Sequence, residues 1–311
     1  MAHLGFGNTC GSASAAVDAL FTKQKNGFMM RDVGGGFSVV RVGEGSSLIP
    51  AVIDIIGRSE CGSTTTAPDP LLDWVYSPRT DGVYGPLAAA PSQHRSNWFK
   101  WFATYSVYFG IARNGTYALV HTASNQVVAA TVTGPPGTVE FGRMSTGEME
   151  QNLRRAGMEL AIEVLVQNQR NKALGMWQEA AQKSCAGLGK HLYVLFFDTV
   201  PEWQGRGCGS ALLHFLGDVA DADGVTSFLE TAGTRNTSFY AQKGSFEVVA
   251  RSPCASFDHE GGAVAMRRLP QRTALTTVEV NTTPHHVFFA KRPTGPLARR
   301  CRVCGEHKDG H

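Results

Sequence analysis

A glycine-rich turn between a predicted strand and a predicted helix constrains the fold of this chain most strongly. Residues 193–197 are three aromatic residues, a valine and a leucine, which predicts a buried strand. An apolar helical pattern begins at Ser210. Between them, Gly205, Gly207 and Gly209 let the backbone approach an anion closely. Because the first turn of a helix offers unpaired N–H groups and the positive end of the helix dipole, this segment predicts a phosphate-binding loop.

Two common nucleotide-binding loops do not fit this turn. A P-loop would place a lysine directly before Ser210, where this chain has Gly209. A dinucleotide-binding loop needs the pattern G-x-G-x-x-G, whereas the three glycines here are spaced by two. The pattern that remains is Gln204-x-x-Gly207-x-Gly209. It resembles the acyl-CoA pyrophosphate loop of the GNAT superfamily, the acetyl-CoA-dependent N-acetyltransferases.

A second block of residues follows at the distance that this family would give it. Asn236 and Tyr240 resemble the family's cofactor-side asparagine and tyrosine. Gly244 resembles the glycine of the family's Gly-Phe turn, although an inserted serine separates it here from the phenylalanine. The resemblance rests on motifs over residues 190–250 and only on pattern over residues 36–145.

The resemblance implies an α/β (α+β) fold with a mixed, twisted central sheet of about six to seven strands, flanked by helices and splayed at the acyl-CoA site. The residue pattern is compatible with this fold, since residues 37–42 predict a first strand and residues 117–132 a hairpin. Residues 148–182 predict one or two helices. We divide the chain into an N-terminal extension over residues 1–32, an acetyltransferase domain over 33–270 and a basic C-terminal tail over 271–311.

The resemblance also implies where acetyl-CoA binds. Main-chain groups of the splayed strand end would pair with the pantetheine arm, and an N–H there would face the thioester carbonyl. Arg206 would add positive charge if it points inward, and it would otherwise be an exposed loop residue. Asn236 would hydrogen-bond the arm, or else cap a helix. The residues assigned to the cosubstrate are Phe197, Asp198, Thr199, Gln204, Gly205, Arg206, Gly207, Cys208, Gly209, Ser210 and Asn236.

Acetyl transfer to an amine needs stabilisation of the tetrahedral oxyanion and a proton for the leaving thiolate. We expect Tyr240 to be the general acid, because a phenol can donate a proton and the family's tyrosine has this spacing; packing under the cofactor is the alternative. Many family members carry the base on the motif strand, where this chain has Tyr193 and Leu195. His191 shares their strand parity and titrates near neutral pH, so we expect it to act as the base through water, against a surface position as the alternative.

Composition narrows the class of protein further. With 311 residues, of which 42% are hydrophobic and 18% charged, the chain can bury a sizeable core. A net charge of +3 is too small to indicate a nucleic-acid partner, and no apolar run is long enough to span a membrane. The seven cysteines are an odd number, and the start of the chain lacks the pattern of a secretory signal, so we expect a cytoplasmic protein.

These observations favour an N-acetyltransferase that moves the acetyl group of acetyl-CoA to a primary amine of a small molecule by direct attack in a ternary complex. We expect a monomer or homodimer that needs no metal, membrane or nucleic acid. One alternative is acetylation of a protein N-terminus or lysine. Another is a non-catalytic acyl-CoA-binding module, which the missing carboxylate at Tyr193 would favour.

The C-terminal tail carries the only pattern that suggests a metal. Cys301, Cys304, His307 and His311 have the residue types of a zinc site. However, only two residues separate Cys304 from His307, which leaves no room for a turn and helix between ligand pairs. We therefore expect a solvated tail.

Overall fold

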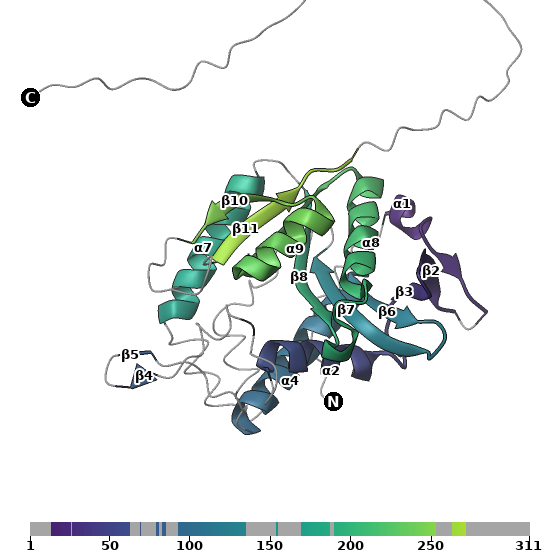
Figure 1. Ribbon diagram of the computed structural model, residues 1–311, viewed down its shortest axis with the longest axis horizontal. Helices are drawn as coiled ribbons and strands as arrows, with labels where there is room; N and C mark the ends of the chain where they lie inside the picture. The colour runs from purple at the N-terminus through teal and green to yellow at the C-terminus, as the bar shows by residue number, and fades with distance from the viewer. Residues whose placement is uncertain are drawn as a thin grey trace, which may run out of the picture. The chain divides into compact units, whose positions relative to one another are not determined.

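A nine-stranded mixed sheet forms the centre of the molecule in the computed structural model, in the order β1-β2-β3-β6-β7-β8-β9-β11-β10 (Figure 1). All neighbouring strands are antiparallel except β8 and β9, which are parallel. The predicted mixed α/β fold with helices on its central sheet is confirmed. The structure describes residues 14–25, 27–62, 69, 79–80, 83–84, 93–134, 154, 169–186, 190–252 and 263–271.

The strands of the sheet are β1 (Thr22–Lys23), β2 (Met29–Gly34), β3 (Phe37–Arg41), β6 (Thr116–His121), β7 (Gln126–Gly134), β8 (His191–Thr199), β9 (Thr226–Ala232), β10 (Glu247–Arg251) and β11 (Ala263–Arg268). A separate two-stranded pair consists of β4 (Arg79–Thr80) and β5 (Val83–Tyr84). The helices are α1 (Ala15–Asp18), α2 (Ile49–Cys61), α4 (Gln93–Ile111), α7 (Gln169–Ala186), α8 (Cys208–Asp223) and α9 (Thr234–Gly244), with a 3-10 turn η2 (Pro201–Trp203). No helix in these ranges is long and apolar enough to cross a membrane.

The sheet has nine strands rather than six or seven because the chain before residue 37 adds to its edge. β2 pairs with β3 and β1 pairs with β2. The expected boundary between an N-terminal extension and the domain, at residue 32, therefore falls inside β2. The expected C-terminal tail lies outside the described residues beyond residue 271.

Two apolar layers cover the sheet on its opposite faces. α8 packs on one face against side chains such as Leu192 and Val194 of β8. α2 and α4 pack on the other face, against side chains that include Phe196. α7 covers β9, β10 and β11 on that second face, where Trp177 contacts a cluster with Tyr193 and Phe228. Figure 1 shows α8 and α9 on one side of the sheet and α7 on the other.

A β-bulge in β8 decides which of its side chains reach each layer. Val132 of β7 pairs with Phe196, whereas the next residue of β7 pairs with Val194, so Leu195 is the extra residue. The bulge shifts the usual alternation by one position. As a result Phe196 and Asp198 face the α2 side, while Phe197 faces α8 and α9.

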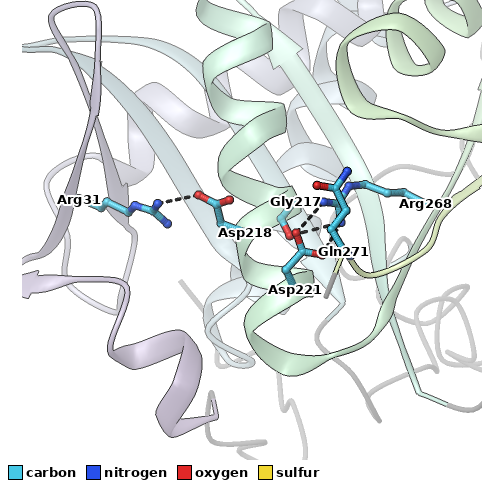
Figure 2. A network of polar contacts seen from close by, with 6 residues as sticks. All are labelled: Arg31, Gly217, Asp218, Asp221, Arg268 and Gln271. Atoms are coloured by element: carbon cyan, nitrogen blue, oxygen red, sulfur yellow. Dashed lines mark hydrogen bonds and ion pairs between the residues drawn. The ribbon is translucent and has the colours of Figure 1, made fainter. Parts of the chain in front are cut away.

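Ion pairs fix α8 between the two halves of the sheet (Figure 2). Arg31 of β2 contacts Asp218 at 2.6 Å. Arg268 of β11 forms a two-pronged contact with Asp221, with N–O distances of 2.8 and 2.7 Å. The backbone N–H of Gln271 donates to the same carboxylate at 2.7 Å. Since the Arg268 and Asp221 side chains are only 9% and 13% exposed, this pair is a buried one and holds α8 firmly against β11.

Candidate functional site

β8 and β9 separate from each other shortly after they begin. Their parallel pairing ends at Tyr193 and Phe228. In the described part of the chain, β8 pairs from Val194 to Thr199 with β7 alone. At the usual rise per residue of a strand, this stretch of β8 leaves an unpaired edge roughly 20 Å long. The backbone groups of this edge face the gap between β8 and β9. The predicted splay of the sheet is confirmed.

The glycine-rich turn lies at the open end of this gap and starts α8. Gly205 and Gly207 have φ values of 74° and 85°, in the left-handed region that favours glycine. Gly207 is the N-cap of α8 and provides no side-chain capping bond, so the N–H groups of the first helical turn point outward without intrahelical partners. Gly209 has a different role, because a Cβ there would lie 3.2 Å from Cζ of Phe239 on α9. The turn therefore combines a preformed helix N-terminus with close packing of α8 on α9.

Two exposed arginines flank this turn. The guanidinium of Arg206 lies 5.1 Å from the centre of the Trp203 ring. Arg235, at the start of α9, donates to the side-chain carbonyl of Gln204 at 3.2 Å, and Gln204 in turn donates to the carbonyl of Thr199 at 3.3 Å. Gln204 thus connects the end of β8 with α9. Sequence reasoning missed Arg235, which lies far from the turn along the chain.

Cys208 begins the first turn of α8 without presenting a reactive side chain. Cys208 is 1% exposed and contacts the core beneath α8. Burial raises the pKa of its thiol, which keeps it protonated. The backbone N–H of Cys208 is thus the group that this residue can offer to a ligand, as the sequence-based assignment requires.

α9 brings Asn236 and Tyr240 to the same region. The N-cap of α9 is Gly233, so Asn236 lies inside the helix and is not its cap. The half-buried Tyr240 ring packs edge-on against Phe197 of β8, with 5.9 Å between ring centres. Burial raises the pKa of the Tyr240 phenol, and the negative charges of a nearby carboxylate cluster raise it further. Tyr240 therefore stays protonated beside the open edge of β8.

This carboxylate cluster consists of Glu60 at the end of α2, Asp69 and Asp198 of β8. Asp198 is 9% exposed, and its Oδ2 has no hydrogen-bond partner among the described residues. Burial and the charge of Asp69 raise its pKa well above the usual range, while a hydrogen bond with Ser59 acts in the opposite direction. Burial and the charges of Asp198 and Asp69 likewise raise the pKa of Glu60. These three acids therefore retain protons at a pH where separate carboxyl groups would have lost them.

His191 lies apart from this cluster, at the closed end of the splay. It pairs with Thr226 in the parallel part of the two strands and is only 4% exposed. Its ring packs edge-on against Phe228, with 5.8 Å between ring centres. The surface position considered for His191 is therefore wrong, because the residue is buried.

The described residues contain no group of three or more His, Cys, Asp and Glu side chains arranged to hold a metal ion. The cysteines and histidines of the C-terminal tail lie outside those residues.

Comparison with models of known protein families gives no match, and a search of curated protein sequences gives none either. Solved structures do resemble the chain. Arylalkylamine N-acetyltransferase 2 from Aedes aegypti is 11% identical over 76% of this chain and 100% of its own, with a TM-score of 0.49. Polyamine N-acetyltransferase from Drosophila melanogaster is 15% identical over 75% and 99%, with a TM-score of 0.46. An acetyltransferase related to histone acetyltransferase HPA2, from Corynebacterium glutamicum, is 16% identical over 75% and 96%, with a TM-score of 0.43.

The structure brings together more acidic groups than the sequence suggested. Asp198 was assigned only a main-chain role, and Glu60 and Asp69 were given none. The signal that could have pointed to Asp198 was its position near the end of the motif strand. Its side chain reaches Glu60 only because of the bulge at Leu195, and a bulge leaves no clear mark in a run of apolar residues.

Proposed function

We propose that this chain is an acetyl-CoA-dependent N-acetyltransferase that acetylates a primary amine of a small molecule. The observation that carries the proposal is that the open edge of β8 and the glycine turn follow each other without a break. The open edge of β8, from Val194 to Thr199, leads directly into the glycine turn at the start of α8. A long, thin molecule that ends in a diphosphate suits such a site, because strand backbone and a helix N-terminus offer complementary groups in a row.

In this proposal the N–H groups of residues 207–210 bind the diphosphate of acetyl-CoA. Arg206 and Arg235 add positive charge from the two sides of the turn. The pantetheine arm then extends along β8 as an added strand would, and a β8 N–H in the gap stabilises the oxyanion. Asn236 hydrogen-bonds the arm from α9.

Acetyl transfer then needs one proton donor and one proton acceptor. The amine nitrogen attacks the thioester carbon, a C–N bond forms, and the C–S bond breaks as the tetrahedral intermediate collapses. Tyr240 donates its proton to the departing thiolate, for which its position against Phe197 and its protonated state are suitable. The proton of the attacking amine passes to the cluster of Glu60, Asp69 and Asp198, whose raised pKa values make the ionised carboxylates stronger bases.

The carboxylate cluster replaces His191 as the proposed base. It lies within electrostatic reach of Tyr240, whereas His191 is buried in the paired part of the strands. It also removes the reason for preferring a non-catalytic module, which was the missing carboxylate at Tyr193. A carboxylate from α2 and the bulged part of β8 supplies the same chemistry.

Calorimetry with acetyl-CoA tests the cosubstrate site. Gly207→Val forces a β-branched residue into a left-handed position of the turn and should weaken binding at least tenfold. Gly224→Val is the matched control, because Gly224 has φ 64° at the other end of the same helix and an added Cβ there also meets nothing within 4 Å. Release of free CoA with a panel of small amines tests the transfer. Unchanged affinity in a folded Gly207→Val protein, or no CoA release with any amine, would refute the proposal.

A further inference from the structure

A further acid, which is partly buried, lies at the point where β8 and β9 separate. Glu230 follows Phe228, the last residue of β9 that pairs with β8, by two positions. Residues two apart on a strand share a face, so Glu230 faces α7 together with Phe228. Tyr193, the last paired residue of β8, donates from its hydroxyl to Oε2 of Glu230 at 2.7 Å. The Tyr193–Glu230 pair therefore bridges the closed end of the gap.

Hydrogen-bond donors surround this carboxylate. Gln182 of α7 hydrogen-bonds both Glu230 and Tyr193. Oε1 of Glu230 is buried and has no hydrogen-bond partner among the described residues, and the indole N–H of Trp177 is in the same situation. No described lysine or arginine forms an ion pair with Glu230. Burial consequently raises the pKa of Glu230 to about 7, although the two hydrogen bonds act in the opposite direction.

Oε1 of Glu230 can accept a further hydrogen bond, and this defines the kind of group that would complete the contacts of the carboxylate. Tyr193 and Gln182 both donate to Glu230, so the carboxylate is held as an acceptor and Oε1 remains for one more donor. A cationic donor would also compensate the buried negative charge. Tyr193, which contacts Glu230, belongs to one apolar cluster with Trp177 and Phe228. The faces of such aromatic rings attract ammonium groups.

We infer that the Tyr193–Glu230 pair is a subsite for a second ammonium group of the acceptor. The preferred acceptor is then an alkyl diamine, with one amino group at the thioester and the other on Glu230. The inference rests on the proposed function, which puts the thioester in the gap beside β8. It adds a substrate class and a residue that selects it. Glu230 binds the acceptor in this scheme and transfers no proton.

Two matched amines test the inference directly. 1,4-Diaminobutane and n-butylamine differ only in the second amino group, and each is titrated into CoA-saturated protein and used as an acceptor with acetyl-CoA. The wild-type protein should bind the diamine about tenfold or more tightly, as expected for a hydrogen bond to a charged group. Glu230→Gln should remove this preference through Kd and KM, while the values for n-butylamine and kcat stay near those of the wild type.

Two further variants separate a binding role from a structural one. Tyr193→Phe removes only the hydroxyl and should reduce the diamine preference by a few-fold. Glu247→Gln is the control, since Glu247 pairs with Arg267 on an exposed part of the neighbouring strands and should leave the preference intact. If Glu230→Gln does not fold, the Tyr193→Phe result decides.

These measurements distinguish failure of the Glu230 subsite from failure of the proposed acetyltransferase function. Acetylation of both amines with equal Kd and KM in the wild type would refute the subsite while leaving the acetyltransferase proposal intact. An equal loss for both amines in Glu230→Gln, or no change at all, would refute it too. Preferential binding of the diamine without release of CoA would support the subsite and count against the acetyltransferase proposal.

Discussion

Replacing Glu230 with glutamine should make the protein more stable at neutral pH. The pKa of Glu230 rises from 4.5 to about 7 on folding, chiefly because of burial. A folded-state pKa above the unfolded one means that the folded protein binds the proton more tightly. The stability that this proton contributes is therefore complete below pH 4.5 and is lost as the pH rises toward 7.

The size of the effect follows from the difference in pKa. A difference of about 2.5 pKa units corresponds to about 3 kcal/mol between the protonated and ionised forms of the folded protein. Between pH 5 and pH 8 the wild-type protein should lose roughly 2–3 kcal/mol of unfolding free energy through this group alone. Glu230→Gln cannot ionise and should not show this part of the loss.

Urea unfolding of the wild type and Glu230→Gln at pH 5, 6, 7 and 8 measures the difference. The contributions of the carboxylate cluster near Tyr240 are common to both proteins and cancel in the comparison. Glu247→Gln is again the control and should follow the wild type across the whole range. Parallel curves for the wild type and Glu230→Gln would refute the reasoning, because they would mean that Glu230 titrates alike in the folded and unfolded protein.

Three further outcomes are expected. Asp198→Asn should lower kcat about a hundredfold or more with little change in acetyl-CoA affinity; full activity would exclude Asp198 as the base. Tyr240→Phe should lower kcat by a similar factor while KM for acetyl-CoA stays within a few-fold, and an unchanged kcat would leave the ring with a packing role only. Arg268→Ala should lower the free energy of unfolding by about 3–5 kcal/mol, because it leaves Asp221 buried without its ion partner. Arg267→Ala, which breaks an exposed pair on the same strand, should cost under about 1 kcal/mol, and equal losses in the two variants would contradict this account.

The glycine turn could be predicted because its signal is local, whereas the splay was expected only from the resemblance to a known family. Gly205 and Gly207 must adopt left-handed backbone conformations, and this requirement is visible in the residue type itself. The period of the apolar residues likewise reports a strand before the turn and a helix after it. The edge strands β1 and β2 were not foreseen, since residues 14–34 combine small and polar residues whose extended shape depends on pairing with β3.

The acidic groups were harder to predict because they depend on contacts between distant segments. Glu60 and Asp198 are far apart along the chain and meet where α2 packs on the bulged part of β8. Glu230 could be placed on a strand from the sequence. Its hydrogen bond from Tyr193 depends on the parallel register of β8 and β9.

The sequence by itself therefore determined the glycine-rich turn between a strand and a helix, since this feature depends on residue type and short-range spacing. Only the tertiary structure decided which side chains could serve as base or amine ligand. The extra residue at Leu195 reverses the direction of every β8 side chain that follows it, and the register with β7 reveals that residue. Side-chain direction on a strand has a period of two, so a shift of one residue moves Asp198 from the α8 face to the acidic cluster beside Glu60.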